Sequence, residues 1–263
     1  MFSVVRSAAF TEQHLAALAA GTIAAVHVPG FLTRTTCQTA LDALTNLPTI
    51  SYDPARVPTP IVRFGPSLND YRRPHPQTTT APGLDTGRYW AAAAEARAAW
   101  RHSGPRPDPV AYAIKHLSAA WGSTIAPATI HGRPVFGGTL REISQGTLIH
   151  DDDVSRELPG LFDQPVVAQL AFNTWLQTPP TGGATTIWRH RPNPGDAQHR
   201  HFYGYRPAAV ANSPHVRLIP EQGDALIFAP TNLHTVDPSQ GGHRVAAAFF
   251  LGLTTTGRFI YWS

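Results

Sequence analysis

Hydrophobic and polar positions follow two different periods along the chain. In the first half, residues 11–21 (TEQHLAALAAG) and 32–48 (LTRTTCQTALDALTNLP) carry apolar residues at helical spacing. The first stretch begins at a threonine suited to an N-cap and ends at a glycine, and the second stops at a proline. Residues 85–104 and 108–122 show the same pattern. We therefore predict four helices in this half.

The second half changes to short apolar runs separated by Gly, Pro and Asn. Such runs are typical of an antiparallel β-sandwich or barrel. We expect strands within FGGTLREIS (136–144), GTLIHDD (146–152), PVVAQLAFNTWLQ (165–177), GGATTIWRH (182–190), VRLIPEQGDALIFAP (216–230), HRVAAAFFLGL (243–253) and GRFIYWS (257–263).

Two segments interrupt these patterns. Residues 49–85 are rich in proline, so we predict a long irregular segment and a candidate lid. Residues 189–215 are rich in His, Arg and aromatic residues and are too long for a hairpin turn, which indicates an insertion over one mouth of the barrel. With no linker between the halves, we expect one domain over 1–263, with a mainly helical annex at 1–124 and a jelly-roll core at 125–263.

Composition narrows the setting of the protein. The chain has 263 residues, of which 42% are hydrophobic, enough for a substantial core. Cys37 is the only cysteine, so no internal disulfide can form, which fits a reducing compartment. The N-terminal stretch is too polar for a signal peptide, and no apolar run approaches the length of a membrane span. We expect a cytoplasmic protein without a membrane partner.

The basic charge does not indicate nucleic-acid binding. The formal net charge is +4 and the isoelectric point is about 9.6. The basic residues are almost all arginine, with Lys115 the single lysine, and they are dispersed without a basic helix or a run of five. We expect a small-molecule partner and no nucleic acid, while the sequence leaves the oligomeric state open.

The stretch GTLIHDDDVSREL, residues 146–158, places one histidine before three aspartates. It is either an exposed acidic turn or part of a metal site. If the stretch is a strand that runs into a loop, His150 and Asp152 point to the same face, because side chains at i and i+2 do so. Asp151 then points the other way, and Asp151 and Asp153 are expected to serve the turn or to support the ligands.

His234 is the candidate third ligand. Two histidines and one carboxylate on one face of an octahedral metal leave three positions open, an arrangement characteristic of non-haem Fe(II) oxygenases. Ten residues after His234, Arg244 opens an apolar strand, and its guanidinium could grip a carboxylate with two parallel hydrogen bonds. His243 beside it is expected to be structural.

Sequence context separates this pair from others with the same spacing. Three His/Arg pairs lie ten residues apart, His131/Arg141, His190/Arg200 and His234/Arg244. The first begins before the single HxD triplet, in the wrong order, and the second falls in the polar insertion. Only the third follows a Gly-Asp turn and an apolar strand.

The order His150-x-Asp152, His234, Arg244 resembles the Fe(II)- and 2-oxoglutarate-dependent oxygenases on a double-stranded β-helix. The resemblance covers roughly residues 128–252. It is carried by PATIHGRPVFGGTLREISQGTLIHDDD, TGGATTIW and EQGDALIFAPTNLHTVDPSQGGHRVAAAFFLG. The group most similar is the bacterial small-molecule group that contains the aliphatic halogenases of indole-alkaloid pathways.

One departure from those halogenases is informative. They have glycine at the position of Asp152, and chloride occupies the vacated site, whereas this chain supplies a carboxylate. The resemblance therefore implies a hydroxylase. It implies an α+β fold with a double-stranded β-helix (jelly-roll, cupin-like) core and N-terminal helices packed on it. It also implies a dioxygenase that uses Fe(II), 2-oxoglutarate and O₂ to hydroxylate an unactivated C–H bond of a small molecule, in natural-product biosynthesis.

Three alternatives remain at this stage. The same oxidation chemistry could give desaturation, cyclisation or rearrangement. The chain could be a non-catalytic jelly-roll binding protein, or a cupin-type metalloenzyme without 2-oxoglutarate.

The resemblance implies roles for the candidate residues. His150, Asp152 and His234 would bind the metal and form the catalytic centre, and Arg244 would bind the distal carboxylate of 2-oxoglutarate. Other residues on predicted strands could contact 2-oxoglutarate, namely Arg141, Asn173 and Thr186. Residues that could wall the pocket or meet substrate are Arg63, Tyr71, Trp175, Trp188, His201, Phe202 and Tyr205.

Overall fold

The four predicted helices are present, and each begins at a side-chain cap. The computed structural model describes residues 2–73 and 83–263. The helices are α1 (Glu12–Ala19), α2 (Arg34–Leu44), α3 (Thr86–Ser103) and α4 (Pro109–Trp121). Their N-caps are Thr11, Thr33, Asp85 and Asp108, whose side-chain oxygens accept backbone N–H groups of the first turn.

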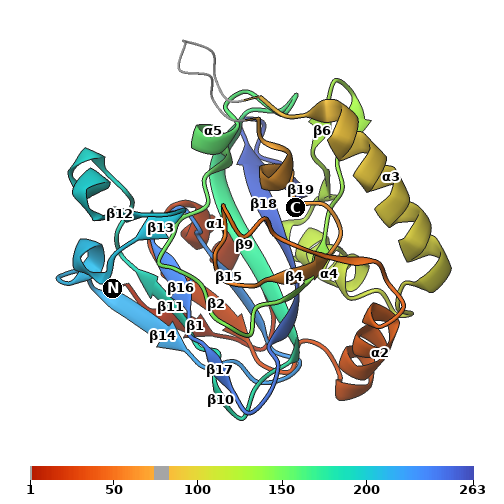
Figure 1. The fold of residues 1–263 in the computed structure, drawn as a ribbon, viewed down its shortest axis with the longest axis horizontal. Coiled ribbons are helices and arrows are strands. Elements are labelled where there is room, and N and C mark those ends of the chain that lie inside the picture. The colour runs from red at the N-terminus through yellow and green to blue at the C-terminus, as the bar shows by residue number, and fades with distance from the viewer. Residues whose placement is uncertain (1, 74–82) are drawn as a thin grey trace.

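A large sheet forms the centre of the molecule (Figure 1). In the described residues it has ten strands, in the order β1 (Val4–Arg6), β2 (Ala25–Val28), β15, β9, β18, β8, β4 (Val62–Phe64) and β3 (Thr49–Ser51), while β19 pairs with β18 and β5 pairs with β19. The strands from the second half are β5 (Ala126–Pro127), β8 (Thr139–Glu142), β9 (Val166–Gln177), β15 (Ala225–Phe228), β18 (Val245–Thr254) and β19 (Phe259–Trp262). The long antiparallel pair β9 and β18 forms the middle of this sheet.

A smaller sheet faces the large one. It consists of β14 (His215–Leu218), β11 (Thr185–Trp188) and β16 (His234–Val236), all antiparallel. Three short pairs complete the strands: β10 (Thr181–Gly182) with β17 (Ser239–Gln240), β12 (Arg200–His201) with β13 (Gly204–Tyr205), and β6 (Thr129–Ile130) with β7 (Arg133–Pro134).

Alternation along β9 separates two apolar layers. Leu170 and Phe172 point to a core shared with the helices, to which Leu15 of α1 and Leu117 of α4 contribute. Residues of the opposite face, such as Trp175, pack in a second cluster with side chains of β11 and β15. The second cluster therefore fills the space between the two sheets, and the helices cover the outer face of the large sheet.

The first half is not purely helical, which corrects the predicted annex. It contributes β1 (Val4–Arg6) and β2 (Ala25–Val28) to one end of the large sheet, and β3 (Thr49–Ser51) and β4 (Val62–Phe64) to the other. These strands have three or four residues, too few for a period to distinguish strand from helix. The predicted irregular segment also holds a 3₁₀ turn, η1 (Leu68–Tyr71), and its part at 74–82 lies outside the described residues.

The predicted strand at 146–152 is wrong as a regular strand. It pairs through isolated bridges, Ile149 with Tyr205 and His150 with His234, because its partner changes from residue to residue. The chain then enters a short helix, α5 (Val154–Glu157).

The insertion at 189–215 is ordered by its own packing. It contains two 3₁₀ helices, η2 (Pro194–His199) and η3 (Pro207–Val210), and the hairpin β12–β13. Tyr205 and Val210 bury against Leu233 beside the small sheet, which fixes the insertion there.

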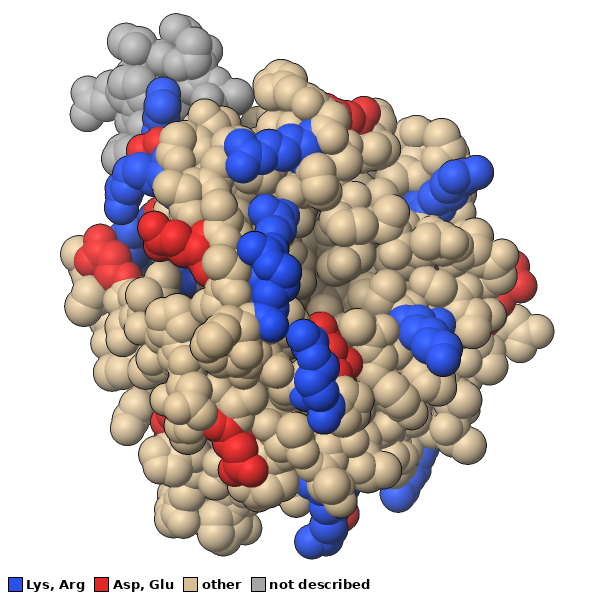
Figure 2. All heavy atoms as spheres, turned by 90° about the vertical axis from the view of Figure 1, so that its right-hand side faces the viewer, with Lys and Arg blue, Asp and Glu red and all other residues tan. Residues whose placement is uncertain are grey.

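The face that carries α3 is shown in Figure 2. Its Lys and Arg side chains lie singly or in a short row, with acidic side chains among them. Within 2–73 and 83–263, no helix has the length and apolar character needed to cross a bilayer.

Phe172 is the residue through which we test this packing. It is fully buried, stacks on Phe249 with 4.7 Å between ring centroids, and meets Phe10 and Phe31 edge to face. Phe172→Ala should lower the free energy of unfolding by about 3–5 kcal/mol, because it leaves a cavity between sheet and helices. Val167 of the same strand is 61% exposed, so Val167→Ala should change the free energy of unfolding by less than about 0.5 kcal/mol. Chemical denaturation measures both variants.

Candidate metal centre and its pocket

His150 and His234 face each other across a reciprocal backbone pair. The N–H of His150 donates to the carbonyl of His234 at 2.9 Å, and the N–H of His234 donates back at 2.8 Å. Their ring centroids lie 4.2 Å apart. Two histidines separated by more than eighty residues thus project side by side from one antiparallel bridge.

Both imidazoles are fixed in the same way. The Nδ1 of His150 bonds the carbonyl of Leu148 at 2.8 Å, and the Nδ1 of His234 bonds the carbonyl of Asn232 at 2.9 Å. A carbonyl can only accept, so each Nδ1 carries the proton and each Nε2 presents its lone pair. This is the tautomer that a metal ligand requires.

Asp152 completes the group. Its backbone N–H donates to the carbonyl of Pro230, and its Oδ2 lies 3.6 Å from the Nε2 of His234 and 3.9 Å from that of His150. One ligand atom from each of the three residues lies within 4.8 Å of the others. Asp151 instead pairs with Arg156, and Asp153 caps α5, as expected of residues that serve the turn.

Electrostatics keep His150 and Asp152 free of protons at their ligand atoms. Burial, aided by the charge of His234, lowers the pKa of His150 to about 4. Burial alone would raise the pKa of Asp152, but the proximity of the His234 and His150 side chains brings it well below its usual range. At neutral pH Asp152 is therefore a carboxylate and His150 a neutral imidazole, and together with the Nε2 of His234 they form a donor set suited to Fe(II).

Arg244 is buried without an acid. Only 2% exposed, it donates from Nε to the carbonyl of Gly183 at 3.1 Å and from Nη2 to the hydroxyl of Thr185 at 3.3 Å, and its guanidinium lies 5.5 Å from the Trp175 ring. Burial, with the nearby charge of Arg141, lowers its pKa to about 9. No described carboxylate forms an ion pair with Arg244. An uncompensated buried guanidinium is costly, so this position suits an anionic ligand.

Three residues predicted to contact 2-oxoglutarate are placed as follows. Arg141 lines the cavity beside the metal centre, and its buried Nε has no hydrogen-bond partner among the described residues. Asn173 lies on β9 two positions before Trp175, hence on the face between the sheets. Thr186 is buried, but its neighbour Thr185 is the one that contacts Arg244, so Thr186 points to the opposite face of β11.

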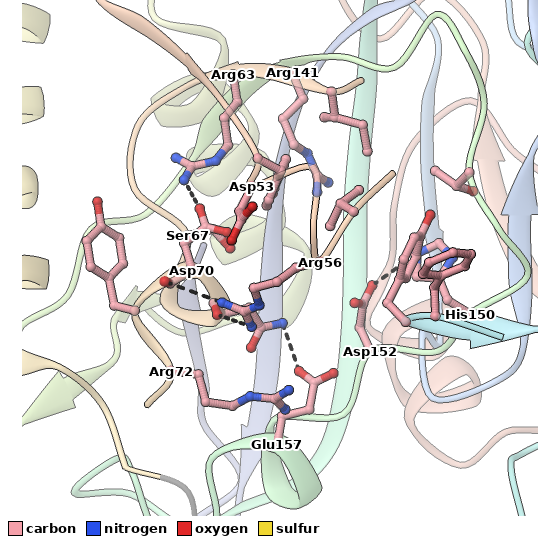
Figure 3. A pocket seen from close by; sticks show the side chains of 18 of the residues that line it. Asp53, Arg56, Arg63, Ser67, Asp70, Arg72, Arg141, His150, Asp152 and Glu157 are labelled. Atoms are coloured by element: carbon pink, nitrogen blue, oxygen red, sulfur yellow. Dashed lines mark hydrogen bonds and ion pairs between the residues drawn. The ribbon is translucent and has the colours of Figure 1, made fainter. Parts of the chain in front are cut away.

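A cavity of about 1100 Å³ opens beside the metal ligands (Figure 3). Its walls come from residues 50–72, from Arg141 on β8, from α5 and from the β12–β13 hairpin. Of the predicted substrate residues, Arg63, Tyr71 and Phe202 line it. Arg63 is already engaged, since it forms an ion pair with Asp70 and donates to the carbonyl of Gly65.

Four other predicted substrate residues lie elsewhere. Trp188 and Tyr205 pack in the cluster under the insertion, and His201 is exposed on β12 outside the cavity lining. Trp175 is fully buried between the sheets beneath Arg244. Aromatic side chains at these positions therefore serve packing, as strand aromatics commonly do.

Several lining residues were missed by sequence reasoning. They are Arg56, Arg72, Glu157, Arg200 and Tyr203. The one available signal was Asp153 ahead of VSRE, an N-cap pattern that predicts the turn of helix on which Glu157 stands. Arg56, Arg72 and Tyr203 come from irregular segments, where no period orients a side chain, and Arg200 lies on β12, a strand of only two residues.

The comparisons with known proteins agree with this geometry. No family model matches the sequence. The chain is 49% identical over 264 residues to the L-gamma-glutamyl-L-propargylglycine hydroxylase of Streptantibioticus cattleyicolor, covering 100% of this chain and 96% of that protein. Its structure is similar to an N-substituted L-amino acid dioxygenase from Burkholderia ambifaria, with a TM-score of 0.64, 17% identity and coverage of 97% and 92% of the two chains.

A second solved structure has the same fold. It is an oxidoreductase of the 2OG-Fe(II) oxygenase family from Burkholderia pseudomallei, with a TM-score of 0.50, 13% identity and coverage of 95% and 94% of the two chains. These likenesses show the double-stranded β-helix fold and confirm the predicted α+β fold class.

The chain belongs to the Fe(II)- and 2-oxoglutarate-dependent oxygenases. It is an enzyme that uses Fe(II), 2-oxoglutarate and O₂, and its reaction is a hydroxylation in natural-product biosynthesis. The alternatives of a non-catalytic binding protein and of a metalloenzyme without 2-oxoglutarate are set aside.

Metal affinity tests the donor set. Asp152→Ala should weaken Mn(II) or Fe(II) binding, measured anaerobically by calorimetry, by more than about 100-fold, because losing a partner outside the ligand set already costs about 10–100-fold. Asp42→Asn, at an exposed position of α2, is the control and should stay within a few-fold. Equal losses in both variants would contradict the assignment of Asp152.

Proposed function

We propose that His150, Asp152 and His234 hold Fe(II), and that the enzyme hydroxylates an unactivated C–H bond of a γ-glutamyl dipeptide. The observation that carries the metal assignment is the group of two Nε2 atoms and one carboxylate beside an unpaired, buried Arg244. The substrate class is supported by the relative that is 49% identical over the whole chain, whose name specifies such a dipeptide.

The donor set fits Fe(II). Two neutral imidazoles and one carboxylate on one side of an octahedral ion leave three positions for other ligands. Bound iron, with 2-oxoglutarate and O₂, supplies the oxidising power that replaces a C–H bond by C–OH. The protein keeps both ring orientations fixed through the carbonyls of Leu148 and Asn232, so that no reorientation is needed on binding.

Arg244 is assigned to the distal carboxylate of 2-oxoglutarate. Its guanidinium can form two parallel hydrogen bonds to that carboxylate, and the hydroxyl of Thr185 lies beside it. Gly183 supports this position, because it fixes the Nε of Arg244 through its carbonyl. Trp175 beneath the guanidinium limits the access of water, which strengthens the ion pair.

Asp152 also bears on the outcome of the reaction. In the aliphatic halogenases that this sequence resembles, glycine stands at this position and chloride takes the place of the carboxylate. A carboxylate at 152 fills that place, which favours hydroxylation over halogenation.

The assignment of Arg244 predicts a selective loss. Arg244→Ala should raise the 2-oxoglutarate concentration required for half-maximal succinate formation by about 10- to 150-fold, the range for a lost charge-assisted hydrogen bond. The control is Arg217→Ala, which removes an exposed ion pair with Asp237 and should leave that concentration unchanged. An unchanged requirement in Arg244→Ala would remove the carboxylate assignment.

The substrate class is tested directly. The enzyme should convert L-γ-glutamyl-L-propargylglycine to a product heavier by one oxygen atom, with one succinate formed per product, when Fe(II), 2-oxoglutarate and O₂ are supplied. Mass spectrometry and succinate assay measure both, and Asp152→Ala should form neither. Wild-type enzyme that makes no oxygenated dipeptide would refute the proposed substrate.

A further inference from the structure

Glu157 presents a carboxylate that no described cation neutralises. It stands at the end of α5 in the cavity wall, half-buried, and its Oε2 accepts a hydrogen bond from the amide of Asn69 at 2.8 Å. Two other acids of the cavity are paired, Asp70 with Arg63 and Asp151 with Arg156, and Asp53 is exposed. Among the described residues, Glu157 forms no ion pair within 4.0 Å.

Arg72 lies near Glu157 but forms no ion pair with it. Both side chains line the cavity and extend toward the same space in Figure 3. The charge of Arg72 is near enough to act on Glu157, yet the two groups form no ion pair. The wall therefore offers one anion and one cation side by side, each without a charged partner among the described residues.

The position of Glu157 is fixed by its contact with the turn at Asn69 and Asp70. Arg56 donates to the backbone carbonyl of Asn69 at 3.0 Å and reaches that of Asp70 at 3.5 Å, so the turn that carries the Asn69 amide is anchored. The Asn69 amide in turn orients the carboxylate. A charged group held in this way is prepared for a ligand, because little ordering remains to be done on binding.

The carboxylate gains from a cation. Burial and the negative charge of Asp152 raise the pKa of Glu157 to about 7, although the Asn69 hydrogen bond and Arg72 act in the other direction. A bound ammonium group would relieve this unfavourable burial of negative charge. Glu157, Asn69 and Asp152 also line one small pocket. A group bound to Glu157 therefore lies close to the metal ligand Asp152.

We propose that Glu157 and Arg72 form a subsite for the α-amino acid end of the substrate, with the ammonium on Glu157 and the carboxylate on Arg72. The inference rests on the proposed function. It explains the choice of a γ-linked dipeptide, because a glutamate joined through its side chain keeps both charged groups on one carbon. In an ordinary α-linked dipeptide the free ammonium and the free carboxylate are at opposite ends.

Two analogues test the subsite, each lacking one charge. Glutaryl-L-propargylglycine lacks the ammonium group, and 4-aminobutanoyl-L-propargylglycine lacks the carboxylate of the glutamyl unit. Wild-type enzyme should prefer L-γ-glutamyl-L-propargylglycine over either by about 10- to 150-fold in kcat/KM, since each analogue leaves one charged group of the protein unsatisfied.

Two variants should separate these preferences. Glu157→Gln should reduce kcat/KM for the γ-glutamyl substrate and remove the preference over the glutaryl analogue, whose own kcat/KM should stay within a few-fold. Arg72→Gln should do the same for the 4-aminobutanoyl analogue only. The exposed α3 residues Glu95 and Arg101 supply matched controls, and Glu95→Gln and Arg101→Gln should keep both preferences.

The outcomes are distinct. No hydroxylation of the γ-glutamyl substrate by wild type would reject the proposed function and the subsite with it. Hydroxylation of all three compounds by wild-type enzyme at similar kcat/KM would reject the subsite alone. This comparison does not depend on whether any variant folds. Variants that slow all three substrates equally would also reject it, because such a loss marks a structural role.

Discussion

The backbone pair between His150 and His234 is the interaction on which the centre depends. It is an isolated bridge rather than part of a regular ladder. Two hydrogen bonds therefore fix the backbone positions of both histidines relative to each other. The carbonyls of Leu148 and Asn232 then determine where the rings point. Asp152 follows after a third backbone bond, to Pro230. The ligand geometry is thus determined by hydrogen bonds to the main chain.

Sequence reasoning identified the helices and most strands because their patterns are long or capped. It also brought His150, Asp152, His234 and Arg244 together, because order and strand context narrow the choice among many histidines. It missed β2, which has four residues and reads like the apolar end of a helix. Elements this short are decided by their partners in the sheet.

The pocket was harder to predict than the metal centre. A strand orients its residues by alternation, which located Arg141 and Asn173 correctly on their strands. Residues 50–72 have no such rule, so Arg56 and Arg72 gave no signal. The insertion was difficult for a different reason, because Tyr205 suggested a substrate contact and is instead buried in the cluster that holds the insertion in place. Charge and aromaticity in a loop do not distinguish these two uses.

The carboxylate of Glu157 and the guanidinium of Arg72 affect which of two similar compounds can bind at this wall of the cavity. Glutamate and 2-oxoglutarate share a five-carbon skeleton and differ at one carbon, which bears an amine or a ketone. A carboxylate at Glu157 repels a dianion and gains nothing from a ketone. In the proposed subsite 2-oxoglutarate would therefore bind less favourably than the glutamyl end of the dipeptide, which alone brings an ammonium group to Glu157.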